Sequence, residues 1–247
     1  MDASGPEGDN GEVNVANVTA ELPRARVPRV GDRIGALLDG VAWERAAVLG
    51  PLLLADGSAA AEQATRVRVL CDRRALYLRF ECADFDAWGT FGQRNDPIYL
   101  EEAVEVFLAP GEETPRRYWE IEVSPLGVVF AAAIANPTGR RADLTADTTW
   151  ECPGLEVRVG AMGADQDWWA ALAIPFAALT GSGAQTESGA MTGPGARAAP
   201  PPARWRGNLY RIERPRGGRA ELSCWSPTLT EPADFHRPER FGHLEMG

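Results

Sequence analysis

Apolar and polar residues alternate with a period of two along most of the patterned segments of this chain. Apolar side chains fall at every second position from Val67 to Cys71 and again from Leu76 to Cys82. A period of two sends successive side chains to opposite faces of an extended strand, so these two segments predict a hairpin over residues 66–82. The same alternation predicts strands at residues 103–108, 118–123, 128–133, 155–159, 168–174, 208–213 and 220–225.

Helical periodicity is scarce. Pro175 follows the strand expected at 168–174 and can take the first position of a short helical turn over residues 176–179. Residues 180–203 are mostly Gly, Ala, Pro, Ser and Thr, which predicts a flexible loop inserted between two strands, and residues 1–29 predict a disordered tail. The sequence therefore predicts one all-β domain over residues 30–247, a jelly-roll-like sandwich of two antiparallel sheets with little helix.

Among the expected strands, the segment over residues 96–110 has the clearest set of candidate ligand-binding side chains. If it is extended throughout, Val104, Val106 and Leu108 share one face. Tyr99 and Glu105 then lie on the other face, together with Glu101. This pattern predicts a row of core residues backed by a row that faces a ligand. The alternative is a strand whose acidic face only meets water.

Composition narrows the range of partners. The chain of 247 residues has a formal net charge of -10, and its pI is about 4.8. Nucleic acids and anionic membrane surfaces attract basic patches, so neither is an expected partner, and a neutral or cationic ligand suits the chain better. There is no signal-peptide pattern and no run of about 18 apolar residues, so a cytoplasmic location is expected by default.

The four cysteines predict buried free thiols. Their spacing fits no zinc-binding pattern. In the expected hairpin Cys71 lies at the turn and Cys82 at the far end, roughly 20 Å away, which is beyond the reach of a disulfide. Cys152 and Cys224 complete the set.

An ordered series of motifs resembles a family 9 carbohydrate-binding module over roughly residues 37–245. The series is Leu38-Asp-Gly40 with Trp43, the hairpin at 67–82, the strand at 99–110, the run from Trp169 through Pro175 into Phe176-Ala-Ala-Leu179, and Phe241-Gly-His-Leu244. The resemblance implies a β-sandwich that binds carbohydrate without catalysis, often beside glycoside hydrolases that degrade polysaccharide.

The resemblance also implies a site. In the family two aromatic rings clamp a terminal sugar while polar groups bond its hydroxyls. Tyr99 takes the place of the first ring, where the family has tryptophan, Glu105 that of the acidic acceptor, and Trp225 that of the second ring, although Trp225 also suits the core. Flat aromatic area matches the apolar face of a pyranose, and carboxylates accept strong hydrogen bonds from hydroxyls. Further candidates near them in the strand pattern are Arg117, Tyr118, Glu120, Tyr210 and Arg211.

Three other readings stay open at this point. A glycosidase would use two carboxylates among Glu101, Glu105, Glu120 and Glu122, held about 5–9.5 Å apart. A haem-binding sandwich would use Met and His side chains. No cofactor is required by the resemblance, but it allows structural calcium, for which Asp84-Phe-Asp86 and Asp165-Gln-Asp167 offer paired carboxylates.

Overall fold

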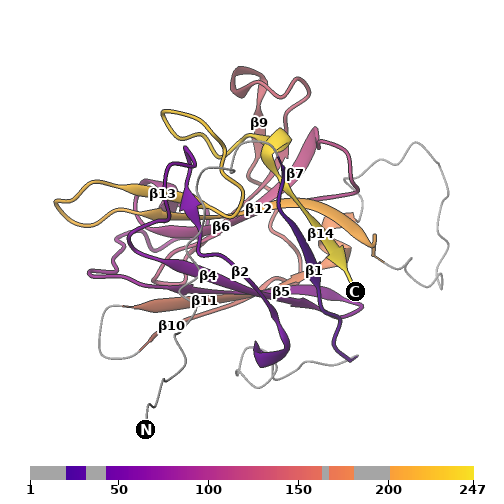
Figure 1. Ribbon diagram of the computed structural model, residues 1–247, viewed down its shortest axis with the longest axis horizontal. Coiled ribbons are helices and arrows are strands. Elements are labelled where there is room, and N and C mark those ends of the chain that lie inside the picture. Colours follow the sequence, from indigo (N-terminus) through magenta and orange to yellow (C-terminus); the bar gives the residue numbers. More distant parts are fainter. Residues whose placement is uncertain (1–20, 32–42, 163–166, 181–200) are drawn as a thin grey trace, which may run out of the picture.

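The computed structural model describes residues 21–31, 43–162, 167–180 and 201–247. Two β-sheets pack face to face in this part of the chain (Figure 1). The larger sheet has nine described strands, and its main path runs in the order β1 (Arg24–Val27), β14 (Gly242–Met246), β12 (Arg204–Glu213), β6 (Ala103–Pro110), β7 (Arg117–Val123), β8 (Val129–Ala135) and β9 (Thr145–Asp147). Off this path, β12 also pairs with β13 (Glu221–Cys224), which pairs with β3 (Leu53–Leu54).

The smaller sheet has five strands among the described residues. Their order is β10 (Glu156–Ala161), β11 (Trp168–Pro175), β5 (Ala75–Cys82), β4 (Thr65–Cys71) and β2 (Ala47–Leu49). Within the described ranges, helix is confined to α1 (Phe176–Thr180) and to short 3₁₀ turns at Trp43–Arg45, Ile98–Leu100, Arg141–Asp143 and Pro238–Arg240. The predicted two-sheet sandwich with little helix is confirmed, as are the hairpin and the short helical turn after β11.

The core between the sheets follows the predicted alternation. Val104, Val106 and Leu108 of β6 pack with Leu78 and Phe80 of β5 in one buried cluster. All four cysteines are buried and unpaired, as expected from their spacing. The alternation of side-chain direction along each strand therefore fixes which residues face the other sheet.

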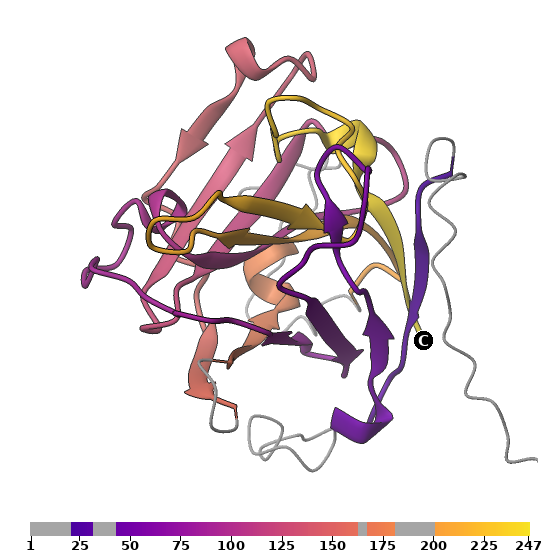
Figure 2. The ribbon, with the colours of Figure 1, turned by 60° about the vertical axis from the view of Figure 1, so that its left-hand side comes forward.

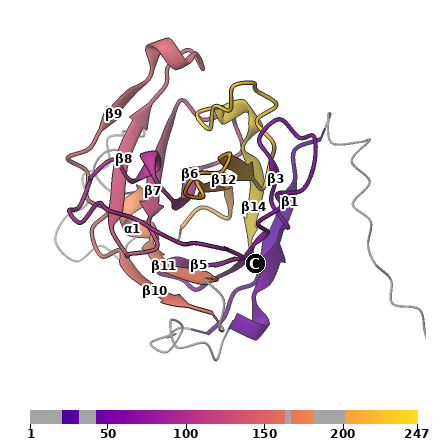
Figure 3. The same ribbon diagram turned by 90° about the vertical axis from the view of Figure 1, so that its left-hand side faces the viewer.

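A second apolar cluster covers the opposite face of the larger sheet. Phe107, Tyr118 and Tyr210 lie there, and Phe235 and Phe241 from the chain between β13 and β14 pack against them. Figure 3 shows this segment, in yellow, on the side of the larger sheet away from the smaller one. Residues 226–241 are called the covering segment below, because they close over the outer face.

Three details differ from expectation. Arg24–Val27 forms β1, which pairs in parallel with β14, so the tail predicted to run through residue 29 ends earlier and not every strand pair is antiparallel (Figure 2). Tyr99 belongs to a 3₁₀ turn, since β6 begins only at Ala103. Residues 1–20 and 181–200, where the tail and the loop were predicted, lie outside the described residues, as does Leu38-Asp-Gly40.

Candidate functional site

Three glutamates gather on the outer face of the larger sheet. Glu105 of β6 is the direct cross-strand partner of Glu122 of β7, and Glu120 lies two residues along the same strand. Residues two apart in a strand share a face, so all three side chains point the same way. One carboxylate oxygen from each lies within 4.8 Å of the others. We call this group the β6–β7 triad.

The triad is shut away from solvent. Glu105, Glu120 and Glu122 are 3%, 6% and 1% exposed. Burial raises the pKa of Glu120 to about 7. Burial and the neighbouring carboxylates also hold the pKa values of Glu105 and Glu122 well above their usual range. Charges buried this close together repel, so the site favours either bound protons or a cation.

The covering segment supplies a histidine beside the triad. His236 Nδ1 shares a 2.8 Å hydrogen bond with the hydroxyl of Tyr118, and His236 Nε2 lies 3.9 Å from Glu120. Burial, aided by Arg141, lowers the pKa of His236 to about 3, so this imidazole is neutral at physiological pH. Sequence reasoning missed this contact, because His236 comes from a proline-rich stretch with no strand pattern.

Eight residues were predicted to contact a ligand, and burial divides them into two groups. Five of them are buried and make contacts inside the protein: Glu105, Tyr118, Glu120, Tyr210 and Arg211. The other three reach solvent: Tyr99, Arg117 and Trp225. In this conformation no sugar can touch the buried five, so their role in binding stays a prediction that requires the covering segment to move.

Tyr99 and Trp225 do not face one another. Tyr99 is 41% exposed, and its ring meets Phe130 edge-on at 5.7 Å, at the border of the outer face. Trp225 follows Cys224 in β13, which belongs to the outer cluster, and Trp225 packs instead against the core between the sheets. Successive strand residues point to opposite faces. The predicted clamp of these two rings around one sugar beside Glu105 is therefore wrong in this structure.

Arg117 points away from the triad, because it lies three residues before Glu120 in β7 and an odd separation sends the two side chains to opposite faces. It precedes Trp119 by two residues, and Trp119 is opposite Leu108 in the ladder. That register puts Arg117 level with Pro110, five residues or roughly 17 Å along β6 from Glu105. Its guanidinium is exposed at the other end of the strand.

Trp225 lines an open pocket of about 620 Å³. The half-buried indole lies against Gly242, where a side chain's Cβ would come within 2.4 Å of the ring. Glu21, Arg24, Arg240 and His243 contribute polar groups to the same pocket. No hydrogen bond among the described residues engages the indole N–H. These residues come from both chain ends, joined by the parallel pairing of β1 with β14, so strand alternation alone gave no signal for them.

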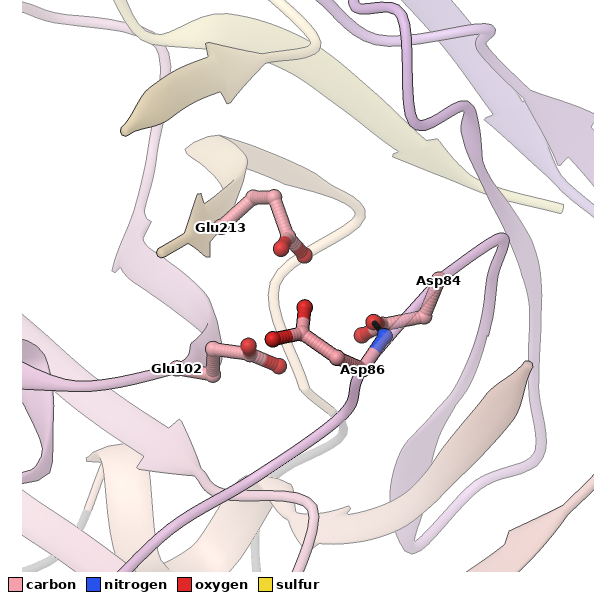
Figure 4. Close-up of side chains that lie close together, drawn as sticks. All are labelled: Asp84, Asp86, Glu102 and Glu213. Atoms are coloured by element: carbon pink, nitrogen blue, oxygen red, sulfur yellow. Dashed lines mark hydrogen bonds between the residues drawn. The ribbon is translucent and has the colours of Figure 1, made fainter. Parts of the chain in front are cut away.

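Asp84, Asp86, Glu102 and Glu213 form a second acidic group (Figure 4). Arg211 lies within 4.0 Å of three of these carboxylates, those of Asp84, Glu102 and Glu213. We call this group the Arg211 cluster. Arg211 donates to Asp84 at 2.7 Å and also to Glu213, and its guanidinium stacks over Trp168. Both hydrogen bonds come from Nη2, while Nε and Nη1 are buried without a hydrogen-bond partner. The guanidinium is therefore enclosed inside the protein and is not free to meet a ligand in this structure.

Charge in the Arg211 cluster is unbalanced. Burial, with the nearby carboxylates of Glu213 and Asp84, raises the pKa of Glu102 to about 9. Burial raises the pKa of Glu213 to about 7, although Arg211 opposes the shift. One guanidinium therefore does not neutralise the four carboxylates around it.

Comparison with known proteins places the chain in a family. The profile of carbohydrate-binding family 9 matches residues 58–246. The chain belongs to this family. A relative from Arthroderma benhamiae, named an extracellular protein, is 33% identical over 81 residues, which cover 32% of this chain and 36% of that protein. The matched stretch thus spans about a third of the relative's length.

Solved structures share the fold of this family 9 module. A Bacteroides uniformis protein, provisionally named as carbohydrate-binding, has a TM-score of 0.68 and 14% identity, covering 92% of this chain and 100% of its own. A family 9 module from Caldicellulosiruptor kristjanssonii in complex with glucose has a TM-score of 0.55 at 13% identity over 91% of this chain and 96% of its own. A family 9 module from the same organism in complex with cellotriose has a TM-score of 0.52 at 13% identity over 91% of this chain and 93% of its own.

The Arg211 cluster of the family 9 module has donors that suit a structural metal ion. In the Arg211 cluster both carboxylate oxygens of Glu102 and one each of Asp86 and Glu213 are buried without a hydrogen-bond partner. Orphaned carboxylate oxygens are the donors that calcium prefers. Of the other predicted pair, Asp165 lies outside the described residues, and Asp167 accepts a hydrogen bond from the backbone of Asp84.

The two other readings find little support in the geometry of the module. The triad carboxylates are too enclosed for a glycosidic bond to pass between them, and Glu101 is held by hydrogen bonds from Thr90. For haem, His236 lies on the outer face whereas Met246 packs in the core between the sheets, so the two cannot ligate one iron. No helix in the described ranges is long and apolar enough to cross a membrane.

Proposed function

We propose that this family 9 module binds a neutral sugar in the Trp225 pocket. The observation that carries the proposal is that Trp225, predicted as an aromatic contact, lines an open pocket together with charged and polar side chains. The indole offers a flat apolar surface for the C–H face of a pyranose. Arg24 and Arg240 are placed to donate to hydroxyl oxygens, and Glu21 to accept from hydroxyl hydrogens.

Two family 9 complexes support glucose units as the first ligands to test. The Caldicellulosiruptor kristjanssonii structures are named as complexes with glucose and with cellotriose. A pocket of about 620 Å³ is large enough for one or two sugar rings. In this proposal the module serves polysaccharide breakdown beside glycoside hydrolases, and its own role is to bind rather than to cut.

Trp225→Ala is expected to weaken sugar binding by about 1–3 kcal/mol, or roughly fivefold to 160-fold, as for stacking of other flat rings on aromatic side chains. Calorimetry with glucose, cellotriose and a panel of other oligosaccharides measures the loss. Trp225→Phe keeps an apolar ring and is expected to retain part of the affinity.

Tyr99→Ala is the matched control for this experiment. It removes the other predicted and accessible ring, on the far side of the sheet, and is expected to leave affinity within a factor of two. Thermal unfolding checks that both variants are folded. Full affinity in a folded Trp225→Ala variant contradicts the pocket, and a large loss in Tyr99→Ala moves the site to the edge of the outer face.

A structural cation in the Arg211 cluster belongs to the same proposal. Glu102, Asp86 and Glu213 hold the orphaned oxygens that would receive calcium, and Arg211 would remain bonded to Asp84. Such an ion would fix the loop after β5 to the start of β6 and the end of β12. It would act on stability and leave the sugar pocket, which other elements form, in place.

A further inference from the structure

The β6–β7 triad differs from the Arg211 cluster in having no guanidinium at its centre. Among the described residues its one ion-pair contact is with His236, which lies 3.9 Å from Glu120 and is neutral at physiological pH. Arg214 and Arg141 lower the pKa values of Glu105 and Glu120 only from a distance. Three buried carboxylates thus face one another with no close positive partner in the described part of the chain.

One oxygen of the triad is also left without a hydrogen bond. Glu122 is 1% exposed, and its Oε2 atom has no partner. A buried polar atom without a partner is costly, so native structures normally satisfy it with a water, an ion or a ligand. Because Glu122 points into the space shared with Glu105 and Glu120, the missing partner belongs between the three carboxylates.

The spacing of the oxygens matches one particular class of ion. The three donor atoms lie within 4.8 Å of one another. Calcium binds oxygens at about 2.3–2.6 Å, so two ligands on opposite sides of one ion are up to about 5 Å apart. Three carboxylate oxygens no more than 4.8 Å apart are therefore compatible with one calcium ion between them. Magnesium gives up its water reluctantly and is rarely held by protein oxygens alone, so three buried carboxylates suit calcium better.

We infer that Glu105, Glu120 and Glu122 bind one hard divalent cation, best matched by calcium, beneath the covering segment. The ion takes oxygen from both strands of the β6–β7 pair and lies next to His236. It supplies the positive charge that the triad lacks and ties the two strands to the segment that closes the outer face. This site is separate from the Arg211 cluster and from the Trp225 pocket.

The two histidines of the chain allow the site to be located directly. His236 lies beside the triad, whereas His243 lies in the Trp225 pocket on another part of the molecule. Imidazole NMR of the full chain, stripped with a chelator at pH 7.5 and titrated with calcium chloride, follows both rings separately. Calcium is expected to shift the His236 resonances and to leave those of His243 in place.

Isosteric variants assign the effect to one cluster. Glu122→Gln is expected to weaken the calcium-dependent shift of His236 at least tenfold, whereas Glu102→Gln, in the Arg211 cluster, leaves it unchanged. Glu113→Gln, at an exposed position, is the general control. Thermal unfolding verifies that each variant is folded.

Two outcomes overturn the inference. If millimolar calcium leaves His236 unmoved in the wild type, the triad is held by protons and not by a cation. If the shift persists in folded Glu122→Gln, or disappears in Glu102→Gln, the ion binds elsewhere. Neither outcome bears on the sugar proposal, because calorimetry with glucose tests that pocket independently.

Discussion

Arg211→Leu is expected to lower the free energy of unfolding by about 3–5 kcal/mol. Arg211 is fully buried and donates to Asp84 and Glu213, and it stacks on Trp168. Removing one partner of a buried ion pair leaves the other charges uncompensated, which is far more costly than removing the whole group. Urea denaturation at pH 7.5, with chelator present, measures the loss.

Charge and geometry can be separated with a second substitution. Arg211→Lys keeps the positive charge but loses the planar guanidinium that stacks over Trp168, so an intermediate loss of stability is expected. Arg117→Leu removes an exposed arginine and is expected to change stability by less than about 0.5 kcal/mol. A loss below about 1 kcal/mol in Arg211→Leu would show that the cluster is not held together by its guanidinium.

Alternation located the strands because each sheet buries one face against the other. The hairpin at 66–82 and the row Val104, Val106 and Leu108 were predicted for this reason, and both were confirmed. Strand β1 was missed because four residues at a sheet edge show too little alternation, and its pairing with β14 depends on a partner more than 200 residues away. Local pattern carries no information on such contacts.

The candidate site was only partly predictable for a related physical reason. Alternation placed Glu105 on the face opposite Val104, which is correct. It could not tell whether that face meets solvent, because burial there comes from Phe235 and His236 in a segment without periodicity. The outer face is therefore a second packed layer, and the accessible aromatic pocket lies elsewhere.

The face toward which each side chain points also explains why the resemblance predicted the aromatic clamp incorrectly. Order along the chain assigned Tyr99 and Trp225 to one pocket, but order does not specify which way a strand-end side chain points. Trp225 is one residue beyond Cys224, and that single step moves its ring to the other face of the sheet. The order of motifs along the chain does not reveal a shift of one residue in register, yet such a shift decides whether a side chain reaches the binding site.

The metal-free protein is expected to lose at least about 3 kcal/mol of stability as the pH rises from 6.5 to 8.5. Burial, with the nearby charges of Glu213 and Asp84, raises the pKa of Glu102 to about 9 from an ordinary value near 4.5. The folded state therefore holds a proton that the unfolded state has released, and each pH unit in this window costs about 1.4 kcal/mol. The stabilisation that the raised pKa of Glu102 provides is fully present below about pH 4.5 and is lost as the pH rises toward 9.

Between pH 6.5 and 8.5 the change in stability comes mainly from the carboxylates and not from His236 or the cysteines. His236 has a lowered pKa, so it makes stability rise with pH only up to about 6.5, and the buried cysteines add their own loss above about pH 8.5. Glu120 and Glu213, with pKa values of about 7, act in the same direction as Glu102, as do Glu105 and Glu122, whose pKa values are raised further. Urea denaturation in chelator at three pH values gives the slope, and Glu102→Gln is expected to reduce it by the share of that one carboxyl, about 1.4 kcal/mol per pH unit. A wild-type slope near zero would mean that these carboxylates are ionised in the folded protein and find their counter-charge within the chain.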